Sequence, residues 1–136
     1  MSTPVVSSNL TRSATAIEIY RGEYKVIKIT VKDAAGDAFD LTDATVFFTA
    51  RKAITDPLPY LSKTSSVTGE INITSPKTAG LIEIPFLTID TLNMDTGEYV
   101  FDVWIEMDVL QGETYPRRHQ LIAASQLIIK MPVTAF

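Results

Sequence analysis

The side chains best suited to catalysis in this chain are a single histidine and scattered carboxylates. His119 follows Arg117 and Arg118, and a nucleophile–base–orienter triad would need its imidazole as the base. No serine stands in a Gly-x-Ser-x-Gly turn, and the sequence has no cysteine to act as a nucleophile. We therefore expect no enzymatic activity, and we expect His119 to be a surface residue at the start of a strand.

Four aspartates lie close enough in sequence to suggest a metal site. They are Asp33, Asp37, Asp40 and Asp43, and calcium favours several hard oxygen ligands from closely spaced loop carboxylates. Their spacing does not match the EF-hand pattern, and turn aspartates often accept hydrogen bonds from their own backbone. We expect no metal, cofactor or small-molecule substrate, with calcium at this cluster as the alternative.

Composition restricts the classes of partner. The 136 residues carry a net charge of −4, whereas proteins that bind nucleic acid usually present a basic face. No apolar run approaches the roughly 18 residues of a membrane span, and the first residues lack the pattern of a secretory signal. We therefore expect no binding to nucleic acid or membranes. The absence of cysteine favours a bacterial or viral protein that is made in the cytosol.

Apolar residues alternate with polar ones through most of the chain, which predicts β-strands. In residues 25–32, for example, Ile27, Ile29 and Val31 fall on one face. About seven or eight such segments are separated by turn residues, as in a β-sandwich. Residues 89–94 could form one helical turn. The chain therefore predicts one all-β domain with an antiparallel, immunoglobulin-like sandwich at 16–136.

A turn with a tyrosine at its end is the strongest local signal. Asp95, Gly97 and Tyr99 stand at alternate positions and open a long apolar strand. In immunoglobulin-like sandwiches, a tyrosine at this place donates its hydroxyl to the backbone a few residues upstream. We therefore predict a structural tyrosine corner at these three residues.

Two segments outside the alternating pattern are candidates for partner binding. Residues 1–15 are rich in serine and threonine and predict an N-terminal arm, either ordered by a neighbouring subunit or folded back on its own domain. Residues 53–68 predict an irregular loop, because Pro57 and Pro59 disfavour a central strand, yet the loop carries apolar side chains. The expected partner-binding residues are Val5, Val6, Leu10 and Arg12 in the arm and Ile54, Leu58, Tyr60 and Leu61 in the loop.

Trp104 is expected outside the main core, because it alternates with Phe101 and Val103. It would then lie under the arm, under a loop or at an interface. Together with Tyr60 or Tyr115, it could form a platform for sugars. A carbohydrate-binding or host-surface-binding module is therefore an alternative function.

The order of several short motifs resembles a known family. These are Tyr-Arg-Gly-Glu at 20–23, Asp33 with Gly36, Asp-Leu-Thr-Asp-Ala-Thr-Val at 40–46, Gly-Leu-Ile-Glu-Ile at 80–84 and Asp-Thr-Gly-Glu-Tyr at 95–99. Over residues 16–131 the chain is similar to the small immunoglobulin-like domains of tailed-phage structural proteins. Among these, it looks like the N-terminal domains of upper-baseplate proteins that attach receptor-binding proteins.

The resemblance implies a structural, non-enzymatic role in a bacteriophage virion. It implies attachment of tail, baseplate or fibre components through contacts with other virion proteins. Capsid decoration is the alternative within the same class. The resemblance also implies a homo-oligomer or many copies on a symmetric particle.

Overall fold

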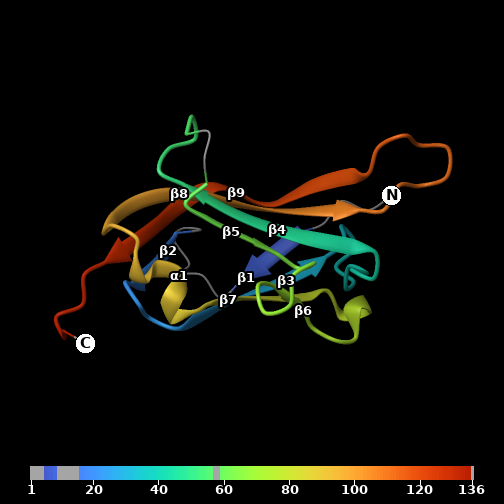
Figure 1. Ribbon diagram of the computed structural model, residues 1–136. Helices are drawn as coiled ribbons and strands as arrows, with labels where there is room; N and C mark the ends of the chain where they lie inside the picture. The colour runs from blue at the N-terminus through green and yellow to red at the C-terminus, as the bar shows by residue number, and fades with distance from the viewer. Residues whose placement is uncertain (1–4, 9–15, 57–58, 136) are drawn as a thin grey trace.

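The computed structural model describes residues 5–8, 16–56 and 59–135, and its strands form two facing sheets (Figure 1). Nine strands lie within these residues, slightly more than the seven or eight expected. They are β1 (Val5–Ser8), β2 (Ile17–Tyr20), β3 (Lys25–Lys32), β4 (Ala44–Arg51), β5 (Leu61–Thr64), β6 (Asn72–Ile73), β7 (Leu81–Phe86), β8 (Gly97–Met107) and β9 (Arg117–Lys130). Two short helices, η1 (Lys77–Ala79) and α1 (Thr88–Leu92), join them.

The strand order is that of an immunoglobulin-like sandwich. One sheet has the order β1-β3-β7-β6 and the other β2-β9-β8-β4-β5. If β1 and β2 are the two halves of a first strand, this corresponds to the A-B-E-D and G-F-C-C′ sheets of immunoglobulin domains. The predicted fold class is therefore confirmed. The described pairs are antiparallel except for β2, which runs parallel to β9.

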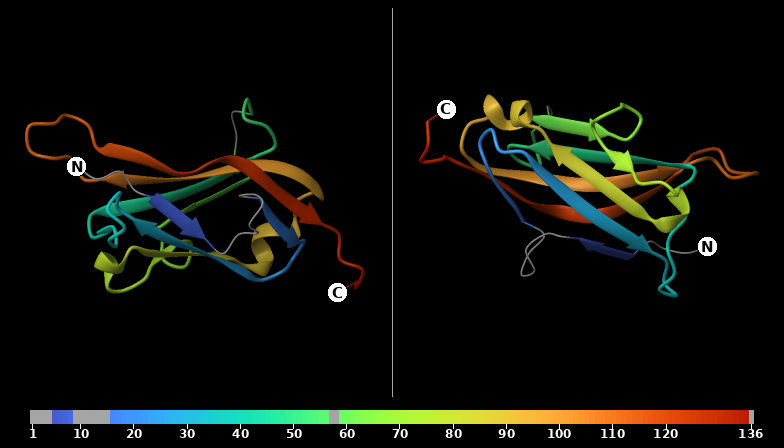
Figure 2. Two further views of the ribbon diagram at one scale, coloured as in Figure 1. Left: turned by 180° about the vertical axis from the view of Figure 1, so that it is seen from behind. Right: turned by 90° about the horizontal axis from the view of Figure 1, so that it is seen from below.

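Two predicted irregular segments contain strands. Leu61–Thr64 forms β5 and pairs with β4, so the prediction of a loop throughout 53–68 was wrong at this point. Val5–Ser8 forms β1 and pairs with β3 of the same chain. This part of the arm therefore folds back on its own domain, which was one of the two alternatives. Both strands are short and lie at sheet edges, which explains their weak sequence signal (Figure 2).

The core lies between the sheets and is built from the predicted inward faces. Ile27, Ile29 and Val31 of β3 are each at most 2% exposed. Phe48 of β4 is fully buried, with its ring centroid 5.3 Å from that of Phe86 in the opposite sheet. Aromatic pairs of this geometry add stability beyond the area that they bury. The alternation in the sequence thus placed the correct side chains in the core.

The predicted tyrosine corner fixes the start of β8. The Tyr99 hydroxyl donates a hydrogen bond of 2.8 Å to the Asp95 carbonyl oxygen, and the side chain is 1% exposed. Gly97 lies between them with φ of 134°, a value that other residues rarely adopt. The turn therefore needs both the glycine and the tyrosine.

Helix α1 connects the corner to the rest of the domain. The Gly22 amide, in the β2–β3 turn, donates to the hydroxyl of the buried Thr91 at 2.8 Å. Lys63 of β5 is only 4% exposed, and its ammonium lies 2.7 Å from the Asp90 carboxylate. Breaking one side of such a pair would leave a poorly solvated charge. These contacts join α1 to the β2–β3 turn and to the five-stranded sheet.

We expect Tyr99→Phe to lower the free energy of unfolding by about 1 kcal/mol, because it removes one buried hydrogen bond and keeps the ring. Urea denaturation at neutral pH measures this change. Tyr115→Phe is the matched control: the Tyr115 side chain is 78% exposed, so this substitution should leave the free energy of unfolding unchanged. Equal stability of Tyr99→Phe and the native chain would show that the hydroxyl contributes nothing.

The same hydrogen bond predicts that the stability of the domain falls as the pH becomes alkaline. Burial, followed by the nearby charges of Asp95 and Tyr60, raises the pKa of Tyr99 above its ordinary value. The unfolded chain therefore ionises first, and this contribution to stability is full below about pH 10 and declines above it. Between about pH 9 and pH 11, the native chain should lose more stability than Tyr99→Phe. Equal losses of unfolding free energy by the native chain and Tyr99→Phe over this pH range would contradict the prediction.

Candidate interaction surface

The outer face of the five-stranded sheet carries an aromatic pair at its centre. Phe47 of β4 and Trp104 of β8 are register partners, and both point away from the core. Side chains directly opposite each other on neighbouring strands lie within contact range. Phe47 is 38% exposed and Trp104 is half-buried. We call these two residues the aromatic pair.

Trp104 lies where the alternation predicted it, outside the main core. Its neighbours Phe101 and Val103 are buried on the other side of the strand. The indole Nε1 donates a hydrogen bond of 3.0 Å to the Asp102 carboxylate, two residues away on the same face. This bond orients the indole ring and satisfies its only polar group.

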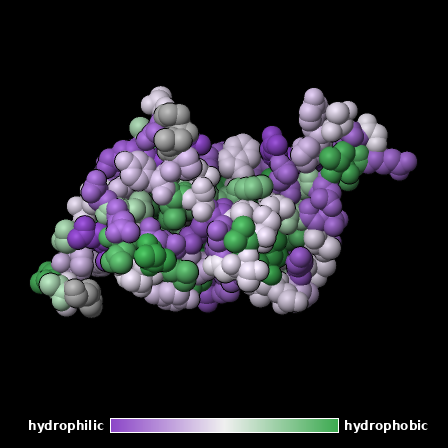
Figure 3. Space-filling view, in the orientation of Figure 1, coloured by the Kyte–Doolittle hydropathy of each residue, from purple (hydrophilic) through white to green (hydrophobic). Residues whose placement is uncertain are grey.

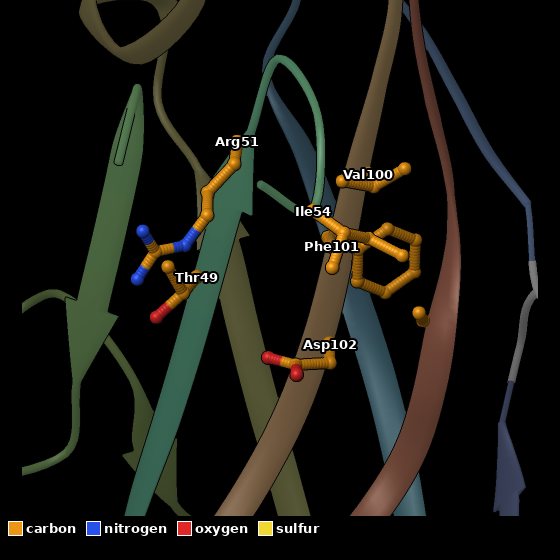
Figure 4. A pocket seen from close by; sticks show the side chains of 7 residues that line it. Thr49, Arg51, Ile54, Val100, Phe101 and Asp102 are labelled. Atoms are coloured by element: carbon orange, nitrogen blue, oxygen red, sulfur yellow. The ribbon is translucent and has the colours of Figure 1, made fainter. Parts of the chain in front are cut away.

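A hollow of about 230 Å³ lies on the same face toward the start of β8. Figure 4 shows Ile54, from the segment that follows β4, beside Val100 and Phe101. The Arg51 guanidinium points away from these apolar side chains and donates to the Asp56 carbonyl oxygen at 2.6 Å. Ile54 is 71% exposed. The predicted partner-binding residue Ile54 is thus brought to the outer face of the sheet.

The other predicted loop residues pack on their own domain. The Tyr60 ring meets the Tyr99 ring edge-on at 5.3 Å between centroids, although half of its side chain stays exposed. Leu61 is partly buried against the core. Leu58 lies outside the described residues. The loop therefore offers Ile54 and one side of Tyr60 to a partner.

The arm residues are placed only in part. Val5 and Val6 belong to β1, opposite Lys32 and Val31 of β3. Leu10 and Arg12 lie outside the described residues. Binding of a partner by these four residues therefore stays a prediction.

The edge of the sheet at β2 is largely closed to strand addition. The Tyr20 amide donates to the Glu23 carboxylate at 2.9 Å, and the Glu23 amide donates back to the Tyr20 carbonyl at 2.9 Å. The Lys25 ammonium donates to the Glu18 carbonyl at 3.0 Å. A partner strand would need these backbone groups. The face of the sheet is consequently a better docking surface than this edge.

His119 has no catalytic setting among the described residues. It lines a small, mainly apolar hollow with Phe39, Met107 and Leu110, whose margin also includes Asp43, Asp108 and Arg117. His119 lies at the start of β9, as expected, but its side chain is half-buried instead of fully exposed.

In the aspartate cluster, the carboxylates of Asp33 and Asp40 accept hydrogen bonds within their own turns. The Asp33 carboxylate accepts from the Ala35 and Asp37 amides at 2.9 and 3.0 Å. Asp40 accepts from the Thr42 hydroxyl and amide, and these bonds lower the pKa of Asp40. In the described ranges, no three acidic or histidine side chains converge as metal ligands. The same ranges contain no helix long and apolar enough to cross a membrane.

Comparison with known proteins identifies no family for this chain. No protein-family model matches the sequence, and no curated protein is significantly similar to it. Among solved structures, the chain is similar to a crystal structure of the Lin-41 filamin domain, with 16% identity, 93% of each chain covered and a TM-score of 0.48. Because this similarity is weak, the assignment of the fold depends on the strand order and the tyrosine corner described above.

We expect Trp104→Ala to destabilise the domain much less than Phe101→Ala. The Phe101 ring is 2% exposed and stacks on Phe48, so its removal should cost about 3–5 kcal/mol. Trp104 is half-buried on the outer face, so its loss should cost about 1–2 kcal/mol. Urea denaturation of the two variants measures both. Equal losses would mean that the indole serves the fold and is not available to a partner.

Proposed function

We propose that this chain is a non-enzymatic assembly protein that docks on other proteins through the outer face of its five-stranded sheet. The observation that carries the proposal is the aromatic pair on that face, in which Phe47 is exposed and Trp104 is half-buried. Tyrosine, tryptophan and phenylalanine are enriched at the centres of protein interfaces, where they supply most of the binding energy.

The surroundings of the aromatic pair suit protein binding. The pair stands on paired strands of the sheet, so little conformational freedom remains to be lost on docking. The Ile54 hollow adds an apolar depression beside it, and Arg51 and Asp102 supply polar groups at its margin. An apolar centre with a polar rim is the usual anatomy of an interface.

We further propose that the partners are other proteins of a tailed-phage virion. Support comes from the order of turn and strand motifs at 20–23, 33–36, 40–46, 80–84 and 95–99, which resembles small immunoglobulin-like phage domains. Attachment of tail, baseplate or fibre components is the first choice, and capsid decoration is the second. Many copies on a symmetric particle would gain avidity from individually weak contacts.

A sugar-binding module has less support from the geometry. That function needs Trp104 in one platform with Tyr60 or Tyr115. Tyr60 instead packs against Tyr99, and Tyr115 lies in the β8–β9 connection. The hollow beside the aromatic pair is smaller than most small-molecule sites.

The test is incorporation into particles. Phage particles purified from cells that make the chain should contain it at a copy number that follows the particle symmetry, as quantitative mass spectrometry would show. The double variant Phe47→Ser with Trp104→Ser should be at least about tenfold depleted, since it removes both anchors. Depletion is counted only if the purified variant is folded by circular dichroism.

Val67→Ser is the matched control. Val67 is a comparably exposed apolar residue, but it lies in the turn after β5 and off the aromatic face. It should leave incorporation unchanged. Absence of the native chain from particles would contradict the virion role, and normal incorporation of the folded double variant would contradict the docking face.

A further inference from the structure

The connection between β8 and β9 forms an exposed apolar knob at one end of the molecule. Figure 1 shows this hairpin projecting beyond both sheets. Val109, Leu110 and Tyr115 are 48%, 42% and 78% exposed. Apolar side chains gathered on a projecting loop are typical of a contact site. We call these three residues the hairpin tip.

Hydrogen bonds hold the loop of the hairpin in one shape. The Glu113 amide donates to the Leu110 carbonyl at 3.0 Å, and Gly112 adopts the φ of 88° that such a turn requires. The Arg117 guanidinium binds the Glu113 carboxylate through Nε at 2.9 Å and Nη2 at 2.8 Å. A loop braced in this way loses little conformational entropy when it binds.

The opposite end of the molecule carries a larger hollow. Figures 1 and 2 place α1, the β2–β3 turn and the C-terminal residues together at this end, far from the hairpin. The hollow measures about 440 Å³ and is lined by Tyr20, Arg21, Pro132 and Val133 among others. Val133 is fully exposed and Tyr20 is 44% exposed. We call it the end hollow; in Figure 3, apolar surface appears at both ends of the molecule.

Each end also carries a charged side chain that has no oppositely charged partner in the described residues, although the Glu23 carboxylate, which accepts from the Tyr20 amide, lines the end hollow too. Asp108 adjoins the hairpin tip, and no cationic side chain in the described residues pairs with it. At the end hollow, the Arg21 guanidinium donates to the Met131 sulfur at 3.6 Å, which is a weak acceptor. No carboxylate of the described residues pairs with Arg21.

We propose that copies of this chain associate head to tail, with the hairpin tip of one copy seated in the end hollow of the next. The contact covers Leu110 and Tyr115 and brings Asp108 to Arg21. Because the two surfaces differ, the contact is heterologous, and each added copy leaves one tip and one hollow free. Such contacts build rings or filaments, whereas a contact between identical patches ends at the dimer.

Sedimentation velocity of the full chain at low salt tests self-association. Over about 5 to 200 µM, the native chain should grow from monomer to species larger than a dimer, as expected for weak interfaces. Asp108→Lys and Arg21→Glu should each weaken association at least about fivefold, because each places like charges together. The two changes in one chain should restore association to within about threefold of native.

Mixing two defective variants tests the head-to-tail geometry. Leu110→Ser with Tyr115→Ser removes the hairpin tip but keeps the end hollow. Val133→Glu with Arg21→Glu blocks the hollow but keeps the tip. Each should be a folded monomer alone, and their mixture should form a one-to-one dimer that grows no further. Val67→Ser, away from both ends, should associate like the native chain.

Three results would overturn the proposal. One is a native chain that stays monomeric throughout the concentration range. Another is undiminished association of the folded tip variant. The last is a mixture of the two variants that stays monomeric. None of these bears on the aromatic pair of the sheet face, which particle incorporation tests separately.

Discussion

The hydrogen bond from Tyr99 to Asp95 is the constraint on which the rest of this molecule depends. It fixes the residue at which β8 begins, and β8 pairs with β4 on one side and with β9 on the other. Successive side chains of a strand point to opposite faces, so a shift of one residue would exchange the core set for the surface set. The corner therefore places Phe101 in the core and Trp104 on the outer face.

The surface left for partners follows from which polar groups are already satisfied. Glu23 and Lys25 occupy backbone groups along β2, and Glu70 accepts from the Thr64 amide at the β5 edge. Natural sandwiches block their edges in this way because an open edge pairs without selectivity. At these two edges recognition is left to side chains, and exposed apolar side chains are found on the sheet face and at the two ends, among other places.

Sequence alone could predict the features that depend on near neighbours. The tyrosine corner lies within five residues, and the alternation around Trp104 is local, so both were predicted correctly. β5 was missed because its sequence, Leu-Ser-Lys-Thr, has little strand character and follows a proline-containing segment. The packing of Tyr60 on Tyr99 was missed because it joins residues far apart in the chain. The arm was expected either to bind a neighbouring subunit or to fold back on its own domain, and the pairing of β1 with β3 shows the second for Val5–Ser8. The hollow beside Ile54 depends on the path of a loop that no periodicity describes.

The sheet face and the two ends are separate surfaces, and this separation decides what assembly can do. A copy held by its hairpin tip and its end hollow still presents Phe47 and Trp104, since these lie on β4 and β8 between the ends. A row of copies would therefore repeat the aromatic face at a fixed spacing. A partner with matching symmetry would bind such a row far more tightly than one copy, because each contact raises the effective concentration for the next. Under this proposal, weak contacts of both kinds would be sufficient for assembly.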